Sequence, residues 1–160
     1  MSRKLRTCTI KNEFNFKILH NIVPSGYVIS KWEKSVSPKC VFCGINETTE
    51  HMLFSCERIS VMWQNISKIL NINITWKVLV CGFIQRHTSQ KVDFINMMLA
   101  IILYSVFKQN SRSKFENKNY KDMNVVQNVK LDLCYRKCIL ECTKYGIYST
   151  KMYDDIVNSL

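Results

Sequence analysis

The sequence predicts a small all-α domain in which a Cys3His zinc turn is inserted between N-terminal helices and a core helix. Three observations lead to this prediction. Apolar residues recur at helical spacing along most of the 160-residue chain. The best alternating segment, residues 71–75, is too short to indicate a strand. Residues 40–56 hold a cysteine and histidine array with the spacing of a metal site.

Composition narrows the class of protein. A hydrophobic fraction of 47% excludes global disorder, and 160 residues are enough to bury a core without disulfides. No apolar signal segment follows Met1, so we expect a reducing intracellular location, nuclear or cytoplasmic. The net charge of +11 favours polyanionic partners, nucleic acid first and an anionic membrane surface second.

Two short helices are expected before the metal array. Residues 1–11 form a basic arm, after which Asn12 is placed to cap a helix that begins at Glu13 and ends at the Val23-Pro-Ser-Gly26 segment. Its expected inner face comprises Phe14, Ile18, Leu19 and Ile22. Ser25 is placed to cap a second helix that ends at Ser37-Pro38. Its expected inner face comprises Val28, Ile29 and Trp32.

The array Cys40, Cys43, His51 and Cys56 has the pattern C-x2-C-x7-H-x4-C. Three thiolates and one imidazole complete the tetrahedral shell of one Zn²⁺ ion and leave no open position for a substrate water. We therefore expect a structural zinc and no zinc catalysis. Gly44, directly after the second cysteine, can take the positive φ that a turn around the metal requires.

The second half of the array constrains the local helix. Thr48 or Thr49 is placed to cap a short helix that carries His51. His51 and Cys56 are five residues apart, which is roughly 140° around an ideal α-helix, so a straight helix cannot point both at one ion. We expect this helix to end just before Cys56.

The clearest helix follows the array. Its apolar stripe comprises Ile59, Met62, Trp63, Ile66, Ile69 and Leu70. Thr75 is then placed to cap a helix from Trp76 to Cys81, with Gly82 as its stop. Phe94 to Phe107 is the most apolar run, but it is shorter than the roughly 20 residues that cross a bilayer, so it predicts a buried core helix and no membrane span.

The remaining sequence is more polar. Residues 108–121 are basic and predict an exposed helix end and loop. Asn124 is placed to cap a last helix to about Tyr145, whose apolar face carries Leu131 and three cysteines. The cysteines are Cys134, Cys138 and Cys142, which we interpret as packing residues because no histidine accompanies them. A loosely held tail is expected from Tyr148 onward.

These elements give four expected parts. Residues 1–11 are a basic arm, residues 12–70 a zinc-stabilised helical module, residues 71–146 a helical core with a basic loop at 108–121, and residues 147–160 a tail.

Several segments, read in order, resemble a known family. They are residues 14–24, residues 28–32, the metal array with Glu50-His-Met-Leu-Phe-Ser-Cys56, Met62-Trp63, residues 76–83 and residues 113–121. They are similar to the reverse-transcriptase zinc-binding region at the C-terminal end of LINE-type, non-LTR retrotransposon replicase polyproteins, and the likeness covers about residues 12–123.

The resemblance implies that Cys40, Cys43, His51 and Cys56 are the zinc ligands. It also implies a segment that lies beyond the polymerase and helps a reverse transcriptase polyprotein to engage template RNA or target DNA. Two departures limit the likeness to known motifs. Residues 153–155, Tyr-Asp-Asp, lack the residue that separates Tyr from the Asp pair in a polymerase signature, and the gap from Cys43 to His51 is three residues longer than in a retroviral nucleocapsid knuckle.

The leading functional hypothesis is a non-catalytic module that binds RNA or DNA through phosphate contacts and base stacking. The expected contact residues form two groups, Arg3, Lys4, Arg6 and Lys11 in the arm and Lys108, Arg112, Lys114, Phe115, Lys118, Tyr120 and Lys121 in the basic loop. An enzyme is not expected, because paired carboxylates, a nucleophile triad and a phosphate-binding glycine loop are missing from the sequence. The alternatives are a docking module of a polyprotein or an orphaned retrotransposon fragment without activity.

Overall fold

The computed structural model describes residues 13–82, 90–115, 126–127, 129–131 and 154–158, and every structural statement below concerns these residues. They fold into helices joined by turns. Within them, extended pairing is limited to one isolated antiparallel bridge between Lys39 and Asn46. The predicted all-α class is therefore confirmed.

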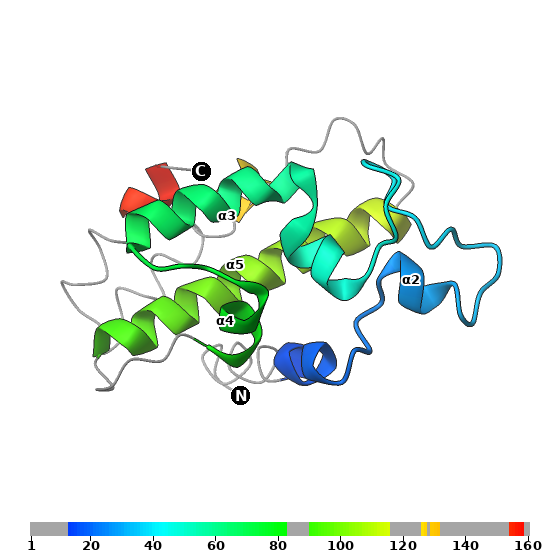
Figure 1. Cartoon of the computed structure of the whole chain (residues 1–160), viewed down its shortest axis with the longest axis horizontal. Coiled ribbons are helices and arrows are strands. Elements are labelled where there is room, and N and C mark those ends of the chain that lie inside the picture. Colours follow the sequence, from blue (N-terminus) through cyan, green and yellow to red (C-terminus); the bar gives the residue numbers. More distant parts are fainter. Residues whose placement is uncertain (1–12, 83–89, 116–125, 128, 132–153, 159–160) are drawn as a thin grey trace.

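The long helix α5 (Gln90–Phe115) lies at the centre of the fold. Figure 1 shows it running through the middle of the molecule, with α3 (Glu57–Leu70) along one side and α4 (Trp76–Cys81) and the N-terminal helix along the other. Ile102, Leu103 and Val106 are fully buried between these elements. The predicted core helix at 94–107 is confirmed, and it extends beyond both predicted ends.

α5 is also long and apolar enough to raise the question of a membrane span. The stretch Lys91–Arg112 has a mean hydropathy of 1.3, but 61% of its apolar window is buried inside the domain. A core helix passes the same test of length and composition, and the packing of α5 matches one. Gln109 and Asn110, predicted to be exposed, are each only 5% exposed, because they follow the fully buried Ser105 and Val106 at four-residue spacing.

α3 and α4 match the sequence prediction. Five of the six stripe residues of α3 are buried, namely Ile59, Met62, Trp63, Ile66 and Leu70, and Ile69 packs partly buried against the core. α4 begins after Thr75, whose Oγ1 accepts a hydrogen bond from the Val78 amide at 3.3 Å. It ends at Gly82, where φ is +89°.

The N-terminal helix spans residues 13–19 and is shorter than expected. Phe14 anchors it on α5, where its ring centroid lies 5.4 Å from Tyr104 and 4.8 Å from Phe107. Leu19 and Ile22, predicted to point inward, are 63% and 46% exposed. Ile22 is exposed because Asn21 adopts a left-handed conformation with φ +53°, so the chain leaves the helical path before it. Leu19 is still helical, but it lies five residues after Phe14, which is roughly 140° around the helix from that buried side chain. Asn12, the expected cap, lies outside the described residues.

The second helix, α2, spans only Gly26–Ile29. Ser25 caps it as predicted, accepting a hydrogen bond from the Val28 amide at 3.3 Å. The predicted continuation to Ser37 is wrong, because the chain passes into turns after Ile29. Trp32, expected to point inward, is therefore 77% exposed.

The C-terminal part is described only in short pieces. Residues 126–127 and 129–131 are helical, as expected for the start of the last helix, and Val129 is buried, whereas Leu131 is 48% exposed and not on a buried face. Residues 154–158 are also helical, and Ile156 and Val157 join the hydrophobic core, so the predicted loose tail is wrong for this segment. Cys134, Cys138 and Cys142 lie outside the described residues.

One core cluster contains residues from both sides of the predicted domain boundary at residue 70. The boundary itself stays a prediction.

Candidate metal centre

The four predicted ligands lie together. The ligand atoms of Cys40, Cys43, His51 and Cys56 are all within 4.8 Å of one another, and they form the group that could hold a metal ion among the described residues. Two separate pieces of backbone present them, a tight turn for the first two and a wide helical turn for the last two.

The first piece is the turn at residues 38–46. The Cys40 amide donates to the Ile45 carbonyl at 2.7 Å, and the Gly44 amide donates back to the Cys40 carbonyl at 2.9 Å. Gly44 has φ +74°, as predicted for a glycine that turns the chain around the metal. This backbone brings the two thiols, three residues apart, to the same side of the turn.

The second piece is η1 (His51–Ser55), a π-helical turn. The Cys56 amide donates to the His51 carbonyl at 3.0 Å, which is an i to i+5 hydrogen bond. Because this turn contains one residue more than an α-helical turn, residues five apart return to nearly the same side. The structure thus solves the geometric conflict that the spacing posed, and the helix ends before Cys56 as predicted. Thr48 is the cap, since its Oγ1 accepts from the His51 amide at 3.1 Å.

Two side chains from the helical core support the π turn. Trp63 Nε1 of α3 donates to the Leu53 carbonyl at 3.0 Å, and Asn110 Nδ2 of α5 donates to the Met52 carbonyl at 3.0 Å. π turns are rare and are frequently found at functional sites. These two bonds connect the metal-binding half of the fold directly to α3 and α5.

The interatomic distances suit a tetrahedral metal ion. Cys40 Sγ lies 3.9 Å from Cys56 Sγ, and Cys43 Sγ lies 3.2 Å from His51 Nε2. With metal to sulfur bonds of roughly 2.3 Å, tetrahedral geometry requires sulfur atoms about 3.8 Å apart. All three cysteines are free, and the 3.9 Å between the Cys40 and Cys56 sulfurs is far greater than a disulfide bond of about 2.05 Å. The residues present therefore fit a bound metal ion.

Burial isolates most of this cluster from water. Cys40, His51 and Cys56 are buried, and Cys43 is half-buried. Burial, together with the charges of the neighbouring Cys40 and Cys43, raises the pKa of the Cys56 thiol to about 12. A metal ion must therefore displace the thiol protons when it binds, because thiolates and not thiols are its ligands.

A cationic side chain covers one side of the cluster. The guanidinium of Arg58 stacks on the Phe42 ring at 3.7 Å from its centroid, and it donates a hydrogen bond to Asn110 Oδ1. Burial lowers the pKa of Arg58, and the charges of Cys56, Cys40 and Glu47 oppose that shift. Arg58 is not among the residues predicted from the sequence, although it is the first basic residue after a segment, 40–57, that contains no Lys or Arg.

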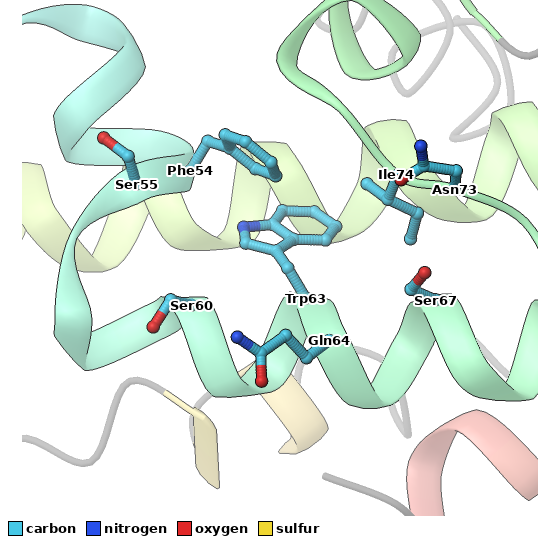
Figure 2. Close-up of a pocket in the computed structure, with 8 residues that line it drawn as sticks. All are labelled: Phe54, Ser55, Ser60, Trp63, Gln64, Ser67, Asn73 and Ile74. Atoms are coloured by element: carbon cyan, nitrogen blue, oxygen red, sulfur yellow. The ribbon is translucent and has the colours of Figure 1, made fainter.

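A hollow lies beside α3, apart from the four cysteine and histidine side chains. Figure 2 shows the ring of Trp63 next to that of Phe54, with serine, glutamine and asparagine side chains around them. The hollow has a volume of about 240 Å³ and is lined by Phe54, Ser55, Ser60, Trp63, Gln64, Ser67, Asn73 and Ile74. Its lining contains no Lys or Arg, so it offers no cation to a phosphate group.

Most of the predicted nucleic-acid residues lie outside the described residues. In α5, Lys108 is half-buried and Arg112 is exposed, and the four-residue spacing places them on the same side of the helix. Lys114 and Phe115 belong to the last turn of α5. Arg3, Lys4, Arg6, Lys11, Lys118, Tyr120 and Lys121 lie outside the described ranges. The two predicted strips therefore stay predictions.

No protein-family model, curated protein or solved structure matches this chain. The likeness to the reverse-transcriptase zinc-binding region thus stays an inference from the sequence motifs alone.

Proposed function

We propose that Cys40, Cys43, His51 and Cys56 hold one structural Zn²⁺ ion. The observation that supports zinc is the donor set, since three thiolates and an imidazole at tetrahedral distances are typical of structural zinc sites. All four positions of such a shell come from protein, so the ion's contribution is to the folding of residues 38–56. Metal analysis of the purified chain should find one zinc per molecule.

We further propose that the module binds nucleic acid without catalysing a reaction, in support of retrotransposon reverse transcription. The supporting observation among the described residues is segment 31–39, whose residues are exposed or half-buried and which leads into the turn at residues 38–46. Trp32 is 77% exposed, and Lys31, Lys34 and Lys39 of the same segment are also exposed. An exposed indole in a segment with three exposed lysines suits a single strand, because a base can stack on the ring while lysines contact phosphates.

The charges favour this segment over the metal turn itself. Zn²⁺ with three thiolates and a neutral imidazole would carry a net charge of −1, and residues 40–57 add three glutamates and no Lys or Arg. Within the exposed segment, Glu33 is the one acidic residue, and Ser35 binds its carboxylate through both the backbone amide and the hydroxyl. Phosphates would therefore contact the lysines that precede the turn.

The test is binding of zinc-loaded protein to single-stranded RNA, single-stranded DNA and duplex DNA across a salt series. Trp32→Ala should weaken single-strand binding by about 1–3 kcal/mol. Phe16→Ala, which removes another exposed aromatic ring outside the segment, is the matched control and should bind normally. Replacing Lys31, Lys34 and Lys39 with Gln should reduce the slope of log affinity against log salt by about 2 to 3.

The predicted strips are tested in the same assay. Reversal of Lys114, Lys118 and Lys121 to Glu, and neutralisation of the basic arm, should each weaken binding and flatten the salt dependence if those strips contribute. Unchanged binding in all of these variants, with zinc content intact, would remove the basis for the nucleic-acid proposal.

The alternative is a docking module of a reverse transcriptase polyprotein. An exposed apolar group at the N-terminal helix favours it, because Phe16, Leu19 and Ile22 are each about half exposed or more. Apolar docking makes no phosphate contacts and releases no counterions, so its affinity would change little with salt. Binding to a polyprotein fragment that is insensitive to salt and lost in Leu19→Ser would support this alternative.

A further inference from the structure

We infer that Arg58 is the cationic partner of the metal-bound thiolates, donating N–H···S hydrogen bonds to the cluster from outside its ligand shell. This inference rests on the proposed zinc site and concerns a residue that the ligand pattern does not include.

The first observation is that Arg58 has unused donors. Its guanidinium stacks on Phe42 and donates to Asn110, but Nε and Nη1 are buried without a hydrogen-bond partner in the described structure. Buried donors without partners are costly, and charged ones most of all. A partner for both atoms is therefore expected in the functional state.

The second observation is what surrounds those donors. A cavity of about 10 Å³ lies between Arg58 and the side chains of Cys40, Cys56 and Glu47, with Phe42, Met52 and Asn110 completing its lining. The cavity is at most large enough for about one water molecule, so a bound ligand does not fit. The available acceptors are thus the two cysteine sulfurs and the Glu47 carboxylate.

Charge favours the sulfurs once metal is bound. Cysteine binds zinc as a thiolate, so a Cys3His complex with one Zn²⁺ carries a net charge of −1. Glu47 already has a defined role, since its Oε1 accepts from the Gly26 amide at 3.1 Å. Arg58 therefore lies where a single positive charge would neutralise the metal complex inside a buried environment.

The test compares zinc affinity of the full chain by competition with a chromophoric chelator. Arg58→Met should bind zinc about 10–100-fold more weakly, the usual loss when a group that supports metal ligands is removed. Arg58→Lys keeps the charge but not the planar donors, so its zinc affinity should lie between those of the wild-type chain and Arg58→Met. Lys68→Met removes an exposed charge from the same helix and should leave the affinity unchanged.

Two further measurements separate this role from packing or from a pair with Glu47. With Co²⁺ in place of zinc, Arg58→Met should move the thiolate-to-metal charge-transfer band to lower energy, because thiolates without N–H···S bonds are more electron-rich. Glu47→Gln in the Arg58→Met background should not restore zinc affinity.

Each outcome decides the question. A loss of less than threefold in Arg58→Met, an unmoved cobalt band, or full rescue by Glu47→Gln would overturn the inference. If Arg58→Met does not fold, Arg58→Lys alone serves as the test, and wild-type affinity together with a wild-type cobalt spectrum overturns it. Failure of the wild-type chain to bind zinc would instead refute the proposed metal site.

Discussion

The metal turn and the helical core hold their shapes by different means. The turn at residues 38–46 exposes its apolar side chains, with Val41 and Ile45 each 57% exposed, whereas Ile66 of α3 and Ile102 of α5 are fully buried. The helices of the core are stabilised because each buries an apolar stripe. The turn buries little apolar surface, and its backbone hydrogen bonds alone do not offset the loss of conformational freedom, which costs about 1–2 kcal/mol per residue.

The difference indicates that the two regions respond to different perturbations, although they share a boundary. η1 forms that boundary, since it carries His51, buries Leu53 in the core and accepts hydrogen bonds from Trp63 and Asn110. Metal binding should therefore stabilise the turn directly, and α3 and the Asn110 end of α5 through η1.

The largest expected effect is removal of the metal. Cys43→Ser should abolish the bound zinc and with it a binding free energy on the order of 10–16 kcal/mol, the range of structural zinc sites. Chelation should act alike and loosen residues 12–70 before residues 94–107. Hydrogen exchange measured segment by segment tests this, with amides 38–56 exchanging first. Uniform exchange along the chain, or undiminished zinc in Cys43→Ser, would contradict the comparison.

The next effect belongs to the core. Ile102 has no exposed surface, so Ile102→Ala should lower the free energy of unfolding by about 2–5 kcal/mol. Zinc affinity should stay near the wild-type value, because Ile102 lies in the middle of α5, two turns before Asn110. Denaturant unfolding and chelator competition on the same variant measure the two quantities, and a large loss of zinc affinity would show that the regions are not separable.

Elements with complete local signals could be predicted from the sequence. α4 has a capping threonine at one end and a glycine stop at the other, and its bounds are those expected. α3 has a stripe long enough to define one face, and the ligand set follows from spacing alone. In each case the deciding interactions join residues close together in the sequence.

Features that depend on one local conformation or on distant partners could not be predicted. Ile22 and Trp32 share a helical pattern with buried residues, but both helices end before reaching them, the first at the left-handed Asn21. The π turn accepts hydrogen bonds from Trp63 and Asn110, and Asn110 lies 58 residues from its acceptor Met52 in the chain. Arg58 could not be singled out from the sequence, because its hydrogen-bond partner Asn110 lies 52 residues away in the chain.

A smaller effect compares two glycines with positive φ. Gly44→Ala adds a Cβ that meets no atom within 4 Å, so its cost is backbone strain of roughly 1–2 kcal/mol and should appear as a loss of zinc affinity. Gly82→Ala, at the end of α4, should lower the free energy of unfolding and leave zinc affinity unchanged. Equal zinc affinities in the two variants would mean that the turn does not depend on Gly44.

The smallest effect compares two caps of the same chemistry. Thr48 Oγ1 accepts from the His51 amide at 3.1 Å, and Thr75 Oγ1 accepts from the Val78 amide at 3.3 Å. Each Thr→Ala change should cost about 1 kcal/mol, because one helix-end amide loses its partner. The place where that cost appears should differ. Thr75→Ala should reduce the free energy of unfolding equally with and without zinc.

Thr48→Ala should instead weaken zinc binding by about fivefold, the equivalent of about 1 kcal/mol, because the turn that positions His51 must then be ordered by the metal itself. The two variants differ in position and not in chemistry, so they isolate the region in which the cap lies. If Thr48→Ala lowers the stability of the zinc-free chain as much as that of the zinc-loaded chain, the turn is already ordered before metal binding. Burial around η1, and not the ligands, would then hold it.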